Sequence, residues 1–329
     1  MGEVGVPKVS VVVIGYNRFA ETTERCLASL LADPRCDDWQ IVVVDNGSDA
    51  SDRDAFEQAR ERYPRMELVR LENNKGYPGG MNAGLEKARG DFMILVSSDV
   101  LLPVGTVGRL TTAMKAHPQA GLIGPVSSYA GNEQQIFVEH ALPVAEIVLA
   151  GSRFADAGGE DTSCLSAYRL DFCCVCLRRS VYQALGGFDE AFNPGYYEDF
   201  DYSLRVRNAG HTVLIAEHVF VFHEGGGTFG RVSEETKKLI KRNKAYFLSK
   251  HGARVWMPHV RDANIAILKQ YAQRAGSAAA APRLRVENRL AFAHRDQPRS
   301  FFKRWRYRRR LAGVEERLAS YSSGTGNPA

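Results

Sequence analysis

Acidic residues cluster within residues 196–210, which read YYEDFDYSLRVRNAG. Glu198, Asp199 and Asp201 stand at the expected start of a helix, with Arg205 one turn further along. A helix N-terminus favours acidic residues, and Asp201 can pair with Arg205, so a structural interpretation of the cluster stays open. The functional interpretation is that one ionised carboxylate accepts the proton of an attacking hydroxyl.

A second set of residues could hold a divalent cation. Asp99 ends the segment SSD after an apolar run, and His223 begins the segment HEGGGT after another. A cation held there would offset charge on a diphosphate, whose oxygens Thr228 and the neighbouring glycines could contact. Taken alone, Asp99 could equally cap a loop, and a histidine at a strand end is usually structural.

Two turns are suited to a nucleotide. Asp45 closes an apolar run and opens the turn DNGSD, where it could bind a base or ribose or simply cap the turn. Residues 73–85, NNKGYPGGMNAGL, form a glycine-rich turn before a helix, where backbone N–H groups could approach a diphosphate. The expected nucleotide-binding residues are Tyr16, Asn17, Asp45, Gly76, Gly80, Asn82 and Ser98.

The first half of the chain alternates strand and helix patterns. Short apolar, β-branched runs occupy residues 9–15, 41–45, 66–71 and 92–97. Helical patterns occupy residues 20–32, 52–63 and 79–89. Runs that are apolar throughout are buried on both faces, which predicts an α/β fold with a mostly parallel sheet and flanking helices. Ligands bind such sheets at the carboxyl ends of the strands, where the polar residues above are found.

The second half is less regular. Residues 125–165 are rich in Gly, Ala and Ser with weak periodicity, which predicts a long mobile excursion. The elements expected after it are a strand at 170–178, helices at 179–185 and 198–209, and strands near 212–223. Beyond residue 231 the chain reads as a charged, helical extension with an Ala-rich linker.

Composition and cysteine usage indicate a cytoplasmic globular protein. The 329 residues are 44% hydrophobic and 25% charged, and no apolar run is long enough to span a bilayer. The start, MGEVGVPKVS, lacks the layout of a secretory signal. Three of the six cysteines lie in FCCVCL, where strand neighbours point to opposite faces. Buried free thiols are therefore expected, with a zinc or disulfide role as the alternative.

The net charge of +5 is unevenly distributed. Residues 299–310, RSFFKRWRYRRR, alternate basic and aromatic side chains. Such a segment suits an anionic membrane surface, which predicts peripheral attachment at the inner membrane face. A solvated basic helix or an oligomer contact is the alternative, and no nucleic-acid partner is expected.

Taken in order, the motifs resemble those of one family. The chain carries YNR, VVVDNGSxD, NxGxxGGxNxGL, a strand ending in an acidic residue, GGFDExF, EDxDxxxRxxxxG and HxxGxT between residue 9 and about residue 228. This series resembles the inverting family-two glycosyltransferases of GT-A type. It is closest to rhamnosyl- and galactofuranosyl-transferase-like members that build bacterial surface polysaccharides.

The resemblance implies a GT-A-like (Rossmann-like) catalytic domain over residues 1–230. Its nucleotide-binding part would span about residues 8–124 and its acceptor part about 125–230, followed by a helical C-terminal extension at 231–329. The implied reaction moves a sugar from a dTDP- or UDP-linked donor to a hydroxyl of a saccharide or lipid-linked saccharide, with inversion.

The resemblance also implies residue roles. Asp199 corresponds to the general base, and Glu198, Asp201 and Arg205 are expected as acceptor-side or supporting residues. Asp99 corresponds to the last acidic residue of the motif that binds Mg²⁺ or Mn²⁺, and His223 to an extra metal or diphosphate ligand. Asp45 corresponds to the residue that binds the nucleobase or ribose.

Two departures from the family pattern bear on function. Ser97 and Ser98 stand where members usually carry further acidic residues or Asn, so weaker cation binding is expected, and Gly15 replaces a common Thr or Ser. The main alternative is a catalytically weakened, sugar-nucleotide-binding relative. A dinucleotide-dependent oxidoreductase is disfavoured, because the turn after the first strand, GYNRFAE, has one glycine.

Overall fold

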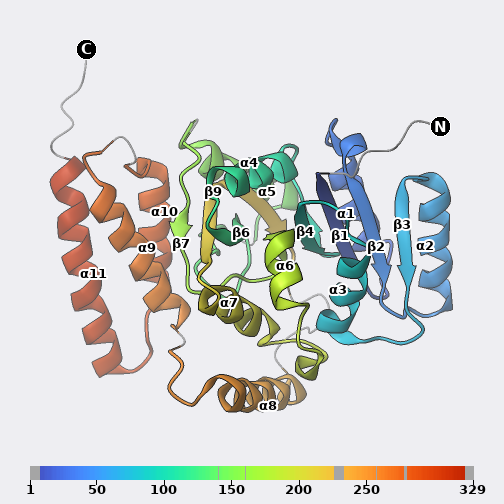
Figure 1. The fold of residues 1–329 in the computed structure, drawn as a ribbon. Helices are drawn as coiled ribbons and strands as arrows, with labels where there is room; N and C mark the ends of the chain where they lie inside the picture. The colour runs from blue at the N-terminus through green and yellow to red at the C-terminus, as the bar shows by residue number, and fades with distance from the viewer. Residues whose placement is uncertain are drawn as a thin grey trace.

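The computed structural model describes residues 8–139, 141–159, 161–225, 233–256, 258–277 and 280–322. Over these residues the chain forms a sheet with helices on both faces. C-terminal helices pack beside one end of this sheet (Figure 1).

The N-terminal part of the sheet is parallel, as predicted. Its elements are β1 (Val9–Gly15), α1 (Thr23–Leu31), η1 (Cys36–Asp38), β2 (Gln40–Asp45), α2 (Ala50–Arg62), β3 (Met66–Arg70), α3 (Gly76–Lys87) and β4 (Phe92–Ser97). β2 and β4 flank β1, and β3 pairs with β2, all in parallel. Along β1, Val11 and Val13 pack in the cluster that contains α1, whereas Val12 and Ile14 pack in the cluster that contains α3. Burial on both faces explains why these strands are apolar throughout.

The second half makes the sheet mixed. Its elements are β5 (Val100–Leu101), α4 (Thr106–Ala116), β6 (Ala120–Ser127), α5 (Val144–Asp156), β7 (Leu165–Ser166), β8 (Cys174–Arg178), α6 (Arg179–Leu185), η2 (Glu190–Phe192), α7 (Glu198–Asn208) and β9 (Thr212–His223). β8 lies antiparallel between β4 and β6, whereas β6 and β9 are parallel. The strand order is β3-β2-β1-β4-β8-β6-β9-β5, with β7 paired to β9. The predicted α/β fold with flanking helices is thereby confirmed.

The prediction of one long excursion over residues 125–165 is wrong in its middle, where α5 forms. Gly151 of α5 lies against the ring of Phe220 on β9, so close that a Cβ atom there would fall 2.3 Å from ring carbons. Ile147 and Phe154 of α5 are buried in the same cluster as Phe220. The small residues that weakened the helical pattern thus let α5 approach the sheet.

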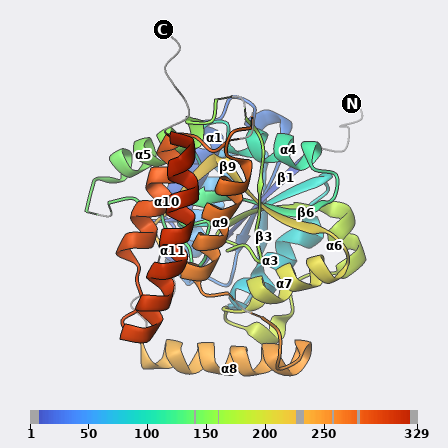
Figure 2. The same cartoon turned by 90° about the vertical axis from the view of Figure 1, so that its left-hand side faces the viewer.

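The C-terminal extension is helical, with α8 (Glu234–His251), α9 (Val260–Arg274), α10 (Arg283–Arg295) and α11 (Phe301–Ser322). α9, α10 and α11 stand together beside β7 and β9, while α8 crosses the lower end of the molecule (Figures 1 and 2). Apolar side chains of these three helices, including Leu268, Ala293 and Leu311, belong to the same core cluster as β6 and β9.

A buried ion pair joins the extension to the sheet. Arg289 of α10 is fully buried and pairs with Glu217 of β9 at 2.7 Å. The hydroxyl of Tyr271 donates to the same carboxylate at 2.6 Å. Breaking such a pair on one side leaves an uncompensated buried charge, so α9 and α10 are firmly attached to the sheet.

Candidate active site

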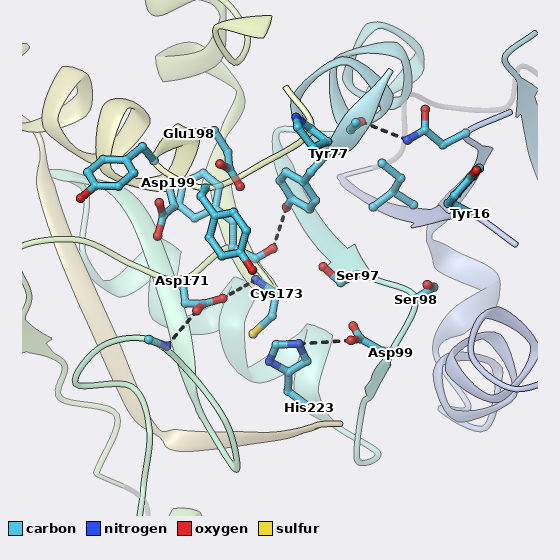
Figure 3. A pocket seen from close by; sticks show the side chains of 18 of the residues that line it. Tyr16, Tyr77, Ser97, Ser98, Asp99, Asp171, Cys173, Glu198, Asp199 and His223 are labelled. Carbon is cyan, nitrogen blue, oxygen red and sulfur yellow. Dashed lines mark hydrogen bonds and ion pairs between the residues drawn. The ribbon is translucent and has the colours of Figure 1, made fainter. Parts of the chain in front are cut away.

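A cavity of about 520 Å³ opens at the carboxyl ends of β1 and β4, where the sequence places the candidate residues. Figure 3 shows its charged side chains converging from several elements. Seven of the predicted residues line it: Tyr16, Gly76, Ser98, Asp99, Glu198, Asp199 and His223. Segments more than a hundred residues apart therefore meet in one site.

Strand pairing brings Asp99 and His223 together. β5 directly follows Asp99 and pairs with the end of β9, placing Val100 opposite His223. The His223 Nε2 atom lies 3.4 Å from an Asp99 carboxylate oxygen. His223 Nδ1 lies 2.9 Å from the Tyr129 carbonyl oxygen, to which it donates, and this leaves Nε2 directed at Asp99. A histidine oriented in this way can bind a cation through Nε2.

The start of β8 adds two residues that the sequence analysis did not assign to the site. Because β8 pairs antiparallel with β4, the Ser97 N–H donates to the Cys173 carbonyl at 2.8 Å. Asp171 accepts hydrogen bonds from the N–H groups of Gly131 and Cys173, both at 3.1 Å. A signal was present in the sequence, since Asp171 stands directly before the apolar run FCCVCL.

Burial and neighbouring charge shift the pKa values of this group. Burial raises the pKa of the Cys173 thiol, and nearby His223 opposes the rise. Burial lowers the pKa of His223, but Cys173 and Asp99 raise it by more, leaving it well above its usual value. The pKa of Asp99 stays low despite burial, because His223 stabilises the carboxylate. In the absence of a cation, Asp99 and His223 therefore form an ion pair near neutral pH.

The carboxylates of Glu198 and Asp199 are presented by a strained helix start. Tyr196 and Tyr197 precede α7 with φ angles of 70° and 77°, a left-handed conformation that is uncommon for aromatic residues. The Asn243 side chain of α8 donates to the Phe192, Gly195 and Tyr196 carbonyl oxygens at 2.8–3.0 Å. α8 thus fixes the loop that aims both carboxylates into the cavity.

The two carboxylates have different partners. Asp199 forms an ion pair with Arg169, whose guanidinium also lies 3.9 Å from the centre of the Phe200 ring. One oxygen of Glu198, Oε2, is buried with no hydrogen-bond partner among the described residues. Sequence analysis missed Arg169, although it stands two residues before Asp171 in the same charged segment.

These partners decide which carboxylate carries the charge. Burial raises the pKa of Glu198 well above its usual value, and the neighbouring Asp199 raises it further. Burial also raises the pKa of Asp199, but the opposing effect of Arg169 keeps this rise smaller than that of Glu198. A proton shared by this pair therefore resides on Glu198, and Asp199 is the ionised member.

Asp201 and Arg205 do not line the cavity, which favours the supporting role over an acceptor-side contact. Asp201 is fully buried and bonded to Arg205 at 2.9 Å, Lys250 at 2.7 Å and His251 at 2.7 Å. Arg205 also donates to the Gly187 carbonyl oxygen at 2.6 Å. Both residues therefore hold α7 against α8 and the turn after α6.

Asn82 and Gly80 are likewise structural, which corrects their predicted nucleotide role. The Asn82 amide accepts from the Phe188 N–H at 2.7 Å and donates to the Phe188 carbonyl at 2.9 Å. A Cβ atom on Gly80 would lie 2.4 Å from Ile14 Cδ1 and 2.9 Å from the Asn46 side chain, so a larger residue there would displace both side chains. Both motif residues support the elements around the cavity but do not line it.

Asp45 and Asn17 are also outside the cavity lining. Asp45 is fully buried, accepts from the Ser48 N–H at 2.9 Å and pairs with Arg70 at 3.2 Å. Asn17 accepts from the Asp49 N–H at 2.9 Å. Both residues stabilise the DNGSD turn, which is the structural reading that the sequence left open for Asp45.

Two other asparagines lie on the cavity in their place. Asn46 donates to the Asn74 side chain at 3.1 Å and to the Gly76 carbonyl at 3.0 Å, and all three residues line the cavity. This network holds the glycine-rich turn at the start of α3. Thr228, the predicted diphosphate contact, lies outside the described residues.

The cysteine alternatives are partly resolved. All six cysteines are free, and all but Cys36 are buried, so no disulfide forms. Cys173 is one of the buried free thiols, as expected, and it also lines the cavity.

The fold resembles that of glycosyltransferases of GT-A type. The structure is similar to that of GalNAc-T7 solved with UDP, GalNAc and Mn²⁺, with a TM-score of 0.53 and 17% identity. The match covers 74% of this chain and 51% of that chain. The family model described as "Glycosyl transferase family 2" matches residues 10–186, so the chain belongs to this family.

Curated relatives agree with the family. An N-acetylglucosaminyltransferase of Mesorhizobium japonicum is 30% identical over 155 residues, covering 45% of this chain and 36% of that protein. Another, from Azorhizobium caulinodans, is 29% identical over 157 residues, covering 45% of this chain and 38% of that protein. The chain thus spans little more than a third of the length of these relatives.

Proposed function

We propose that this protein transfers a sugar from a UDP- or dTDP-linked donor to an acceptor hydroxyl with inversion, and that Asp199 is the general base. One observation carries the proposal: Asp199, which is paired with Arg169, shares a cavity with the Asp99–His223 pair. A base and a leaving-group site within one cavity are what a single displacement requires.

The donor is proposed to lie over the ends of β1 and β4. Tyr16 and Asn74 offer an aromatic face and an amide group to the nucleoside, and Asn46 lines the same part of the cavity with Gly76 at the start of α3. The acceptor hydroxyl would enter beside α7 and lose its proton to Asp199 as its oxygen attacks the anomeric carbon. Glu198, which holds the shared proton, keeps the pair from carrying two negative charges.

The cavity residues fit a divalent cation. Asp99 supplies a carboxylate with a lowered pKa, and His223 presents Nε2 because Nδ1 is bonded to the Tyr129 carbonyl. Mg²⁺ or Mn²⁺ bound there would stabilise the charge that develops on the leaving diphosphate. The structure of GalNAc-T7 with UDP and Mn²⁺ supports this proposal. Ser97 and Ser98 offer no carboxylate, so the proposed dependence on the cation is weaker than a two-carboxylate site would give.

The acceptor is proposed to be a saccharide or lipid-linked saccharide of surface polysaccharide synthesis, reached at the inner membrane face. Among the described residues, no helix combines the length and hydrophobicity needed to cross a bilayer. Phe301, Phe302 and Trp305 are exposed by 76%, 76% and 55% at the start of α11. This end of α11 and the lysine-rich α8 lie at the same end of the molecule (Figures 1 and 2). Exposed aromatics among basic residues suit anionic lipid.

A catalytically weakened relative is the second candidate, favoured by Ser97 and Ser98. The deciding experiment incubates the protein with a panel of nucleotide sugars, with and without saccharide acceptors. Release of nucleoside diphosphate and a product of inverted anomeric configuration by NMR are expected. Donor binding without release in any combination would favour the weakened relative, and a product that retains configuration would exclude single displacement.

A further inference from the structure

Three different metal-binding side chains meet at one place in the cavity. A carboxylate oxygen of Asp171, the sulfur of Cys173 and a ring nitrogen of His223 all lie within 4.8 Å of one another. Figure 3 shows the Cys173 sulfur between the other two residues, on the side of His223 away from Asp99. Side chains this close can surround one ion with small rotations.

The backbone already orients two of these ligands. His223 donates Nδ1–H to the Tyr129 carbonyl, and Asp171 accepts from the Gly131 and Cys173 N–H groups. Cys173 is fixed by the pairing of β8 with β4. Outer hydrogen bonds of this kind are characteristic of metal-binding histidines and carboxylates, whose basicity and direction they set.

The donor set is chemically unlike that of a magnesium site. Mg²⁺ takes oxygen ligands, whereas a thiolate, an imidazole and a carboxylate together suit Zn²⁺ and Co²⁺. We infer that Asp171, Cys173 and His223 form a binding site for a cation of the zinc type. Binding would replace the thiol proton of Cys173 with a bond from sulfur to the metal, and that proton would leave to solvent.

The site shares His223 with the proposed catalytic cation, so the two cannot both use this ligand at once. Zn²⁺ is therefore expected to inhibit sugar transfer and to compete with Mg²⁺ or Mn²⁺. This consequence rests on the proposed function, but the binding of zinc does not.

Cobalt spectroscopy tests the site directly. Titrating the full-length protein with Co²⁺ should produce a thiolate-to-cobalt charge-transfer band and visible bands of a tetrahedral site, both abolished by Zn²⁺. Cys173→Ser should remove the charge-transfer band, and His223→Gln should weaken cobalt binding by at least about tenfold. The matched control is Cys36→Ser, because Cys36 is the more exposed thiol and is absent from the cavity lining.

The outcomes separate this inference from the proposed function. Absence of the charge-transfer band in the wild-type protein, or its persistence in a folded Cys173→Ser variant, would overturn the site. If that happened while a nucleotide sugar still bound with Mn²⁺, only this inference would fail. A normal cobalt band in a protein that binds no nucleotide sugar would uphold the site and remove the proposed function. If the Cys173→Ser variant does not fold, loss of the band in His223→Gln supports the site.

Discussion

The two walls of the cavity are built from different kinds of residue. The wall formed by the turns after β2 and β3 is uncharged, and its members Asn46, Asn74 and Gly76 are hydrogen-bonded to one another. The wall formed by the segment before β8 together with α7 and β9 carries Arg169, Asp171, Glu198, Asp199 and His223. The hydrogen-bonding groups of the first wall already have partners within the protein, so the wall is rigid and suits binding of the donor.

The charged wall differs because its groups perturb one another. Glu198 and Asp199 compete for one proton, Arg169 holds the charge on Asp199, and His223 pairs with Asp99. Perturbed pKa values of this kind gather where protons or charge are transferred. We therefore expect substitutions in the charged wall to lower turnover and substitutions in the uncharged wall to lower affinity for the donor.

The largest effect is expected at Asp199. Asp199→Asn should lower turnover by at least about a hundredfold and leave donor affinity nearly unchanged, because proton transfer matters in the transition state and little in donor binding. Steady-state kinetics and donor titration measure the two quantities. Wild-type turnover in this variant would transfer the role to Glu198, and Glu198→Gln is the matched comparison.

Arg169 should act through Asp199 rather than on substrate. Arg169→Met removes the cation that opposes burial, so the pKa of Asp199 should rise and the acid limb of the pH–rate profile should move up by about one pH unit or more. The sign follows because the base must be ionised, so activity is lost as pH falls through its pKa. Arg169→Lys should restore part of the shift. An unmoved acid limb with reduced turnover would assign Arg169 a different role.

Asp99 should control donor affinity through the cation. Asp99→Ala is expected to weaken donor binding by about tenfold in the presence of Mn²⁺ and to have little effect in its absence, because it removes one ligand. Isothermal titration under both conditions measures the difference. If the enzyme keeps full activity after exhaustive chelation, catalysis does not require the cation. His223 would then contact the phosphate directly.

The exposed aromatics of α11 should affect membrane binding without affecting catalysis. Deleting residues 299–329 is unsuitable as a test, because Tyr307, Leu311 and Val314 of α11 are buried in the core. Replacing Phe301, Phe302 and Trp305 together with serine should lower binding to anionic vesicles by at least about tenfold and spare transfer to a soluble acceptor. Leu284→Ser, an exposed change on α10, is the control. Equal vesicle binding by both variants would contradict the membrane proposal.

The smallest effect on chemistry is expected at Asp201, a motif carboxylate outside the cavity. Asp201→Asn weakens its bonds to Arg205, Lys250 and His251 and should lower the free energy of unfolding by about 2 kcal/mol. Chemical denaturation measures this loss. The acid limb of the pH–rate profile should stay in place, and a shift comparable to that of Arg169→Met would mean that Asp201 also titrates in catalysis.

The sequence predicted the sheet around β1 well, because those strands are buried on both faces and carry continuous apolar runs. It also placed Asp99, Asp199 and His223 at strand or helix ends, where the structure finds them. Residue type and spacing alone do not separate Asp199 from Asp201, and only the family resemblance singled out Asp199, because one carboxylate faces the cavity and the other faces α8 only after folding. Arg169, Asp171 and Cys173 were missed for the same reason: the pairing of β8 with β4 brings them to the site.

The measurement that tests the central claim most directly is thermal stabilisation by nucleotide sugars, with and without Mn²⁺. A ligand at about 100 times its dissociation constant adds roughly 2.7 kcal/mol to stability. We expect a uridine- or thymidine-diphosphate sugar to stabilise the protein, and to do so more strongly with Mn²⁺. Stabilisation by NADH with no response to any nucleotide sugar would contradict the assignment of this cavity to sugar transfer.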